Sequence, residues 1–112
     1  MDGLFMEQQV ENDSSLKEMI VMNVHLEHVG KLKRMLESRC KVRCANGALA
    51  ARWWIAVDGE STFLLESSYV NKEGWQRAND AIQTMLDPAD GGLESVLAGP
   101  PLIGLFRSSA MP

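Results

Sequence analysis

The 112-residue sequence lacks the patterns by which several large classes of protein are identified. Its longest apolar run is far below the about 18 residues that suggest a transmembrane helix, so we expect no membrane partner. It has neither a Gly-rich nucleotide-binding motif nor clustered metal ligands, so we expect no cofactor and no metal. Lys and Arg number 11 against 15 Asp and Glu, and from the net charge of -4 we expect no nucleic-acid partner.

Cysteine is also scarce, because the chain has only Cys40 and Cys44. Their spacing of four in a helical segment places them on one face without good disulfide geometry. A metal site would need more ligands than this pair offers. We therefore expect two reduced, structural thiols.

Residues 1–15 contain no Lys or Arg, whereas a secretory signal begins with positive charge. This segment also has no sustained hydrophobic period, so we interpret residues 1–16 as an N-terminal arm. The domain is expected to span residues 17–107, and residues 108–112 form a short tail. The expected location is the cytoplasm.

The composition is that of one globular domain, with 46% apolar and 23% charged residues. Hydrophobic periodicity predicts six main elements. These are a strand over 17–27, a helix over 28–45, strands over 51–57 and 60–69, a helix from the N-cap Asn71 to Asp87-Pro88, and a strand over 102–107. This βαββαβ order indicates an α+β, ferredoxin-like fold, with one four-stranded antiparallel sheet and two helices on one face.

The dipeptide Asp58-Gly59 predicts a two-residue hairpin turn. That turn pairs Trp54 with Phe63 and Ala51 with Glu66, and it sends the adjacent Trp53 and Trp54 to opposite faces. Both faces of the sheet are then apolar, although the helices cover only one. We therefore expect a homodimer that packs sheet to sheet.

The segment from Phe63 to Trp75 passes from an apolar strand containing Glu66, through Tyr69, into a capped helix. Together with the element order over residues 17–107, it resembles the dimeric α/β-barrel superfamily, which includes antibiotic-biosynthesis-monooxygenase-like, stress-responsive barrel and NIPSNAP-like proteins. The resemblance implies dimerisation into an α/β barrel, and it implies cofactor-independent oxygenation of a small aromatic molecule as one activity. Haem degradation, known in one branch, is disfavoured: Asn23 and Trp75 match that branch, but Met85 stands near the position of its helical His.

The candidate site residues are polar or aromatic side chains on the expected strands and second helix. Asn23 and His25 are candidate catalytic residues that share a strand face, and a histidine can act as a general base or donate a hydrogen bond to a ligand carbonyl. Its alternative role is that of an ordinary, partly exposed strand residue. Glu66 either forms a structural ion pair or lines a wet cavity. Trp54 and Trp75 either form an apolar wall for the substrate or serve as core and interface anchors.

Six basic residues of the first helix are expected to form its solvated outer face. They are Lys31, Lys33, Arg34, Arg39, Lys41 and Arg43. The leading hypothesis is a homodimer that binds a small apolar organic molecule and acts as a cofactor-independent monooxygenase. Asn23 and His25 would be catalytic, and Trp54, Glu66 and Trp75 would contact the substrate. The alternative is a non-catalytic dimeric interaction or ligand-carrying module.

Overall fold

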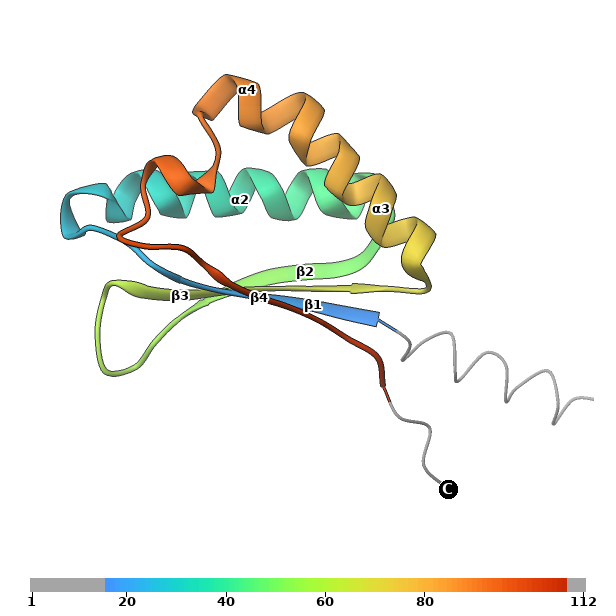
Figure 1. Cartoon of the computed structure of the whole chain (residues 1–112), viewed down its shortest axis with the longest axis horizontal. Coiled ribbons are helices and arrows are strands. Elements are labelled where there is room, and N and C mark those ends of the chain that lie inside the picture. Colours follow the sequence, from blue (N-terminus) through green and yellow to red (C-terminus); the bar gives the residue numbers. More distant parts are fainter. Residues whose placement is uncertain (1–15, 109–112) are drawn as a thin grey trace, which may run out of the picture.

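A computed structural model describes residues 16–108 and contains one four-stranded antiparallel sheet. The strands are β1 (Leu16–Asn23), β2 (Ala48–Ile55), β3 (Thr62–Tyr69) and β4 (Leu102–Phe106), and their order across the sheet is β2-β3-β1-β4. The helix α2 (Val29–Ala45) links β1 to β2, and α3 (Lys72–Ala81) follows β3. Both helices lie on the same side of the sheet (Figure 1). The ferredoxin-like prediction is therefore confirmed.

Four short helical segments lie between these elements, one after β1 and three between α3 and β4. They are η1 (Leu26–His28), the π-helical turn η2 (Ile82–Leu86), α4 (Asp87–Asp90) and η3 (Leu93–Ser95). Within residues 16–108, no helix has both the length and the apolar character needed to cross a bilayer. The predicted arm and tail lie outside the described residues, apart from Leu16, which begins β1, and Ser108.

The core lies between the sheet and α2. Alternate residues of β1 and β3 point toward the helices, and they include the fully buried Met22, Phe63 and Leu65. The helix contributes Leu32 and Leu36, which are also fully buried. Removing the apolar surface of these side chains from water is the main favourable term in folding. The contact between the sheet and α2 therefore stabilises the domain.

The second helix begins where the sequence predicts. The side-chain oxygen of Asn71 accepts a hydrogen bond from the backbone N–H of Gly74 at 3.0 Å, which satisfies one of the free donors at the helix start. Much earlier in the chain, Gly47 makes the turn from α2 into β2 with a φ of +124°. A Cβ on Gly47 would lie 2.6 Å from the carbonyl oxygen of Gly74, so glycine is required where these two segments touch.

The end of the second helix differs from the prediction, because Asp87-Pro88 does not close it. The π-helical turn η2 follows α3 directly, and α4 then continues to Asp90. Pro88 lies in the first turn of α4, where a missing N–H is tolerated. The helix ends instead at Gly91, whose φ of +86° is a typical glycine C-terminus.

The predicted register of the hairpin is wrong by one residue. Trp54 pairs with Leu64 rather than Phe63, and Glu66 pairs with Arg52 rather than Ala51. The connection is longer than two residues, since β2 ends at Ile55 and β3 begins at Thr62. Arg52 and Glu66 therefore lie on one face, whereas the two-residue turn placed them on opposite faces.

The first strand is shorter than the predicted range of 17–27. It ends at Asn23, and only Val24 continues the pairing, through an isolated bridge to Leu97. His25 is extended but lies outside the strand, where it precedes η1. The expectation that Asn23 and His25 share one strand face is therefore wrong.

Candidate functional site

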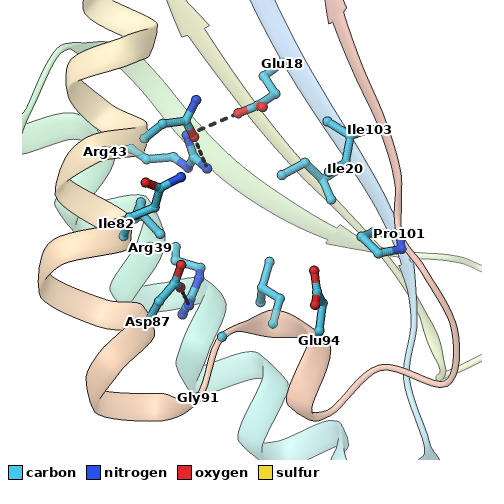
Figure 2. Close-up of a pocket in the computed structure, with 14 residues that line it drawn as sticks. Glu18, Ile20, Arg39, Arg43, Ile82, Asp87, Gly91, Glu94, Pro101 and Ile103 are labelled. Atoms are coloured by element: carbon cyan, nitrogen blue, oxygen red, sulfur yellow. Dashed lines mark hydrogen bonds and ion pairs between the residues drawn. The ribbon is translucent and has the colours of Figure 1, made fainter.

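A pocket of about 420 Å³ lies between the sheet and the end of the second helix (Figure 2). Its apolar lining consists of Ile20, Ile82, Leu93, Pro101 and Ile103. Its polar side chains come from β1, from α2, from the continuous segment of α3, η2 and α4, and from η3. They are Glu18, Arg39, Arg43, Asn79, Gln83, Asp87 and Glu94. The pocket therefore combines an apolar wall with charged groups.

One side of this pocket carries a buried ion pair between the first strand and the first helix. Arg43 Nη1 lies 3.1 Å from Glu18 Oε1, and only 4% and 6% of the two side chains are exposed. Arg43 also donates hydrogen bonds to the hydroxyl of Tyr69 at 2.9 Å and to Asn79 Oδ1 at 3.4 Å. The Tyr69 hydroxyl in turn donates to Ser67 Oγ at 2.9 Å. These contacts fix the guanidinium beside the pocket.

The ion pair is not fully hydrogen bonded. Despite the short distance, Glu18 Oε1 makes no hydrogen bond of acceptable geometry, and Arg43 Nε also has no hydrogen-bond partner among the described residues. We interpret the contact as a charge interaction between imperfectly aligned groups. Buried polar atoms are normally hydrogen bonded, so two such atoms beside one pocket form a feature that needs an explanation.

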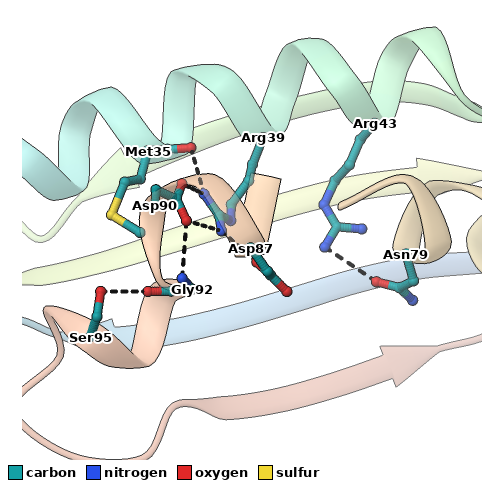
Figure 3. A network of polar contacts seen from close by, with 8 residues as sticks. All are labelled: Met35, Arg39, Arg43, Asn79, Asp87, Asp90, Gly92 and Ser95. Carbon is teal, nitrogen blue, oxygen red and sulfur yellow. Dashed lines mark hydrogen bonds and ion pairs between the residues drawn. The ribbon is translucent and has the colours of Figure 1, made fainter. Parts of the chain in front are cut away.

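A second cluster, centred on Arg39, closes the pocket on the side of α4 (Figure 3). The Arg39 guanidinium contacts Asp87 Oδ1 at 2.7 Å and Asp90 Oδ2 at 2.8 Å, and its side chain is only 1% exposed. It also donates to the carbonyl oxygen of Met35 at 3.4 Å. The hydrogen bond from Arg39 lowers the pKa of Asp90, assisted by the N–H of Gly92. Arg39 is therefore fully engaged in tying α4 to α2.

The placement of Arg39 and Arg43 corrects the expectation of a uniformly basic outer face on the first helix. Both arginines are buried, at 1% and 4% exposure. Their spacing explains this: residues 32, 36, 39 and 43 follow one helical stripe, so the arginines extend the apolar stripe of Leu32 and Leu36. That spacing was the signal in the sequence by which they could have been found.

Glu18 was also missed, although its position carries a signal. It stands two residues before Ile20 and four before Met22, so strand alternation places it on the same inward face. A carboxylate at such a position needs a cation, and Arg43 provides one.

Neither candidate catalytic residue lines the pocket. Asn23 is exposed at the end of β1, where its side-chain oxygen accepts a hydrogen bond from Thr62 Oγ1 at 2.8 Å. His25 is exposed, and its ring packs edge-on against His28 with 6.2 Å between centroids. The structure does not bring either residue to the polar groups described above.

Trp54 and Glu66 lie on the sheet face that points away from the helices. Trp54 Nε1 donates to Glu66 Oε1 at 3.0 Å, and Lys17 Nζ lies 2.8 Å from Glu66 Oε2. The Arg52 guanidinium is 5.9 Å from the centre of the Trp54 ring. The hydrogen bond from Lys17 lowers the pKa of Glu66, and Trp54 adds to this. Glu66 thus has the ion pair that one of its two interpretations requires.

Trp75 is half-buried on α3, and its indole Nε1 is buried without a hydrogen-bond partner among the described residues. It does not line the pocket described above. The two cysteines are free, as expected, and burial raises the pKa of Cys40 to about 11. In the described part of the chain, no three His, Cys, Asp or Glu side chains gather in a way that could hold a metal ion.

Comparison with solved structures identifies the fold. The chain is similar to Rv0793 from Mycobacterium tuberculosis, with a TM-score of 0.75 and 12% identity over 88% of this chain and 98% of the other. SnoaB, a cofactor-independent oxygenase from Streptomyces nogalater, gives a TM-score of 0.72 and 12% identity over 88% and 96%. An antibiotic biosynthesis monooxygenase gives 0.66 and 14% over 87% and 99%.

No protein-family model matches the sequence, and the search of curated proteins found no match. The likeness to the solved structures shows that the chain has the ferredoxin-like fold that antibiotic-biosynthesis-monooxygenase-like proteins also have. Likeness at this level of identity defines the architecture, and the site has to be argued from this chain's own residues.

Proposed function

We propose that this protein binds a small organic molecule in the pocket between the sheet and the second helix. The pocket itself is the observation that carries the proposal. Its volume of about 420 Å³ suits a molecule of a few fused rings, and its apolar wall would bury the body of such a molecule. The buried Glu18–Arg43 pair supplies the few polar groups that fix orientation.

The reaction that we propose is a monooxygenation without a cofactor. The support is the fold, which the cofactor-independent oxygenase SnoaB shares. The chemistry balances when a substrate CH₂ group becomes a carbonyl: one oxygen atom of O₂ enters the product, and the other leaves as water with the two hydrogens. The protein would bind the substrate, exclude water and accept a proton. Glu18 is better placed for the proton than Asn23 or His25, because it alone of the three lines the pocket.

The alternative is a ligand-carrying module without catalysis. Its support is that the two buried arginines of the pocket are already bound to protein carboxylates, as a structural role would require. Oxygen consumption separates the two functions, since a carrier binds the molecule without using O₂.

The first test is binding of 2-naphthol, measured by its own fluorescence, to the unchanged protein and to two variants. Ile103→Trp fills the pocket wall, and we expect it to weaken binding by at least about tenfold through steric exclusion. Val57→Trp is the matched control, because Val57 is fully exposed in the β2–β3 connection. Equal binding by the protein and Ile103→Trp would contradict the proposed site. An oxygen electrode then reports whether 2-tetralone, a bicyclic molecule of similar size that has CH₂ groups, is oxidised or merely carried.

We also propose that the protein is a homodimer that buries the outward face of the sheet. This face carries Trp54, Leu102 and Phe106, which are 48%, 74% and 54% exposed in the single chain. The half-buried Met19, Val21 and Leu64 lie between them in the strand register. An apolar face of this extent is unusual on a monomer. Light scattering tests the proposal: Phe106→Asp should yield a monomer, and a monomeric unchanged protein at micromolar concentration would overturn it.

A further inference from the structure

The charged groups that a molecule in the pocket can reach differ from those that are buried beside it. The guanidiniums of Arg39 and Arg43 are only 1% and 4% exposed, and both already face protein carboxylates. In contrast, the side chain of Asp87 is 40% exposed, and Glu94 is an exposed residue of the pocket lining. The accessible charges of this pocket are therefore carboxylates.

The charges around the pocket do not balance. Two guanidiniums and four carboxylates line it or contact its lining, and they belong to Arg39, Arg43, Glu18, Asp87, Asp90 and Glu94. Glu94 takes part in no ion pair within residues 16–108. The excess of negative charge attracts a cation and repels an anion. A carboxylate or phosphate ligand is therefore disfavoured, whereas a cationic one is favoured.

Glu94 is held beside the pocket by an ordered turn. Gly91 and Gly92, with φ values of +86° and +80°, turn the chain from α4 into η3. The backbone N–H of Gly92 donates to Asp90 Oδ1 at 3.0 Å, and the hydroxyl of Ser95 donates to the carbonyl oxygen of Gly92 at 2.7 Å. In Figure 2 the Glu94 carboxylate points from this turn into the pocket. The fold thus fixes the backbone from which this carboxylate reaches a ligand.

We infer that the pocket takes an organic amine that is protonated at neutral pH. Its ammonium group donates to the Glu94 carboxylate and is attracted by the charge of Asp87. Its apolar body packs against Ile20, Ile82 and Ile103. Both carboxylates keep contact with water, so the ammonium group retains part of its hydration and does not pay the full cost of burial. This assignment of a ligand class rests on the proposed function, because it concerns the same pocket.

Three probes that share one bicyclic body separate the possible ligand charges. They are 2-aminotetralin, which is a cation at pH 7, the uncharged 2-tetralol, and the anion tetralin-2-carboxylate. Titration calorimetry with the unchanged protein at pH 7 and 0.1 M NaCl measures their binding. We expect the amine to bind about tenfold more tightly than the alcohol, because two partly exposed carboxylates each contribute a modest attraction. The anion should bind more weakly than the alcohol.

A variant then identifies the protein group. Glu94→Gln removes one of the two accessible charges without breaking an ion pair, and it should reduce the preference for the amine over the alcohol to about threefold. Glu60→Gln is the matched control, because it removes the same charge from an exposed position in the β2–β3 connection, and it should leave the preference unchanged. Raising NaCl to 1 M should also reduce the preference of the unchanged protein, since salt screens exposed charges.

The outcomes distinguish this inference from the proposed function. Equal binding of the amine and the alcohol, or tighter binding of the anion, overturns the inference and leaves a ligand pocket in place. A preference that Glu94→Gln does not reduce overturns the assigned role of Glu94. No binding of any of the three probes, together with no binding of 2-naphthol, overturns both the inference and the proposed function. A preference for the amine that falls with Glu94→Gln and not with Glu60→Gln supports both.

Discussion

Two glutamates lie almost opposite each other on neighbouring strands and point to opposite faces of the sheet. Glu18 of β1 pairs with Ser67, and Glu66 of β3 pairs with Met19. The inward Glu18 meets Arg43 beneath the helices, where about one twentieth of each side chain is exposed. The outward Glu66 meets Lys17, and their side chains are 20% and 48% exposed. One type of residue in equivalent positions is thus placed in two dielectric environments.

Because the two ion pairs differ in exposure, we expect removal of one partner to change the free energy of unfolding by different amounts. A buried pair loses most of its hydration, and removal of one partner leaves a charge that neither water nor protein compensates. An exposed pair keeps much of its hydration, so removal of one partner changes little. Glu18 therefore constrains the fold around the pocket, whereas Glu66 tunes the outer face.

The largest expected effect comes from removing the cation of the buried pair. Arg43→Met should lower the free energy of unfolding by about 3–5 kcal/mol, because Glu18 is left buried and unpaired. Lys17→Met, the matched change on the outer face, should lower it by less than about 1 kcal/mol. Urea denaturation measures both. Similar losses for the two variants would show that the two pairs are energetically alike.

Adding Glu18→Gln to Arg43→Met should recover part of that loss, since the uncompensated charge disappears. The same cycle with Glu66→Gln and Lys17→Met should give little coupling. A coupling energy near zero for the inner pair would contradict the buried ion pair.

The Arg39 cluster is expected to respond to pH with a defined sign. Its hydrogen bond lowers the pKa of Asp90 in the folded protein, so the contribution to stability is complete above the ordinary pKa of 3.8. It is lost as pH falls through the lower, folded value. Asp90→Asn should lower the free energy of unfolding by about 1–3 kcal/mol at pH 7. Thermal unfolding of both proteins between pH 7 and pH 3 should show the difference shrinking on acidification, and a constant difference would exclude an ionised Asp90 as its source.

Glu66→Gln should have a smaller effect on the stability of the single chain, of up to about 1 kcal/mol. Lys17 and Trp54 both contact this carboxylate on the face proposed to form the dimer. A loss of dimer or of melting temperature supports the structural role of Glu66. Unchanged stability and an unchanged dimer would exclude the structural role.

The smallest expected effect is that of salt. At 1 M ionic strength the Debye length is about 3 Å, which screens exposed charges far more than buried ones. The stability difference made by Lys17→Met should therefore nearly vanish, whereas that made by Arg43→Met should persist. Urea titrations of both variants at 0.1 M and 1 M NaCl measure this, and equal salt sensitivity would remove the distinction between the two faces.

The architecture was predictable from the sequence because it depends on long periodic segments. The alternation in β1 and β3, the helical spacing in α2 and the Asn71 cap are local signals that the packing reinforces. The register of the β2–β3 hairpin was not predictable from Asp58-Gly59 alone, because a longer connection accommodates the same dipeptide. That single-residue shift moved Arg52 to the face of Glu66.

The polar side of the pocket was missed for a different reason. Charged residues on a helix are normally solvated, so Arg39 and Arg43 were assigned to the outer face despite their place on the apolar stripe. Their burial depends on carboxylates that are distant in sequence, since Glu18, Asp87 and Asp90 reach them only in the folded chain. No local pattern shows which carboxylate each arginine will contact.

The π-helical turn η2 also has a consequence for which changes in length this chain tolerates. An α-helix turns about 100° per residue, so the wider turn at Ile82–Leu86 sets the angular phase of everything that follows. Deleting one residue there, such as Thr84, would restore an α-helical turn and leave Asp87 and Asp90 in nearly the same phase, still facing Arg39, because a π turn holds one residue more than an α turn. The connection at 56–61, which is exposed over most of its length, has no such phase to keep. A one-residue deletion should therefore be tolerated in η2 as well as in the hairpin connection, whereas the same deletion within α2 before Arg39 would turn that side chain away from both aspartates.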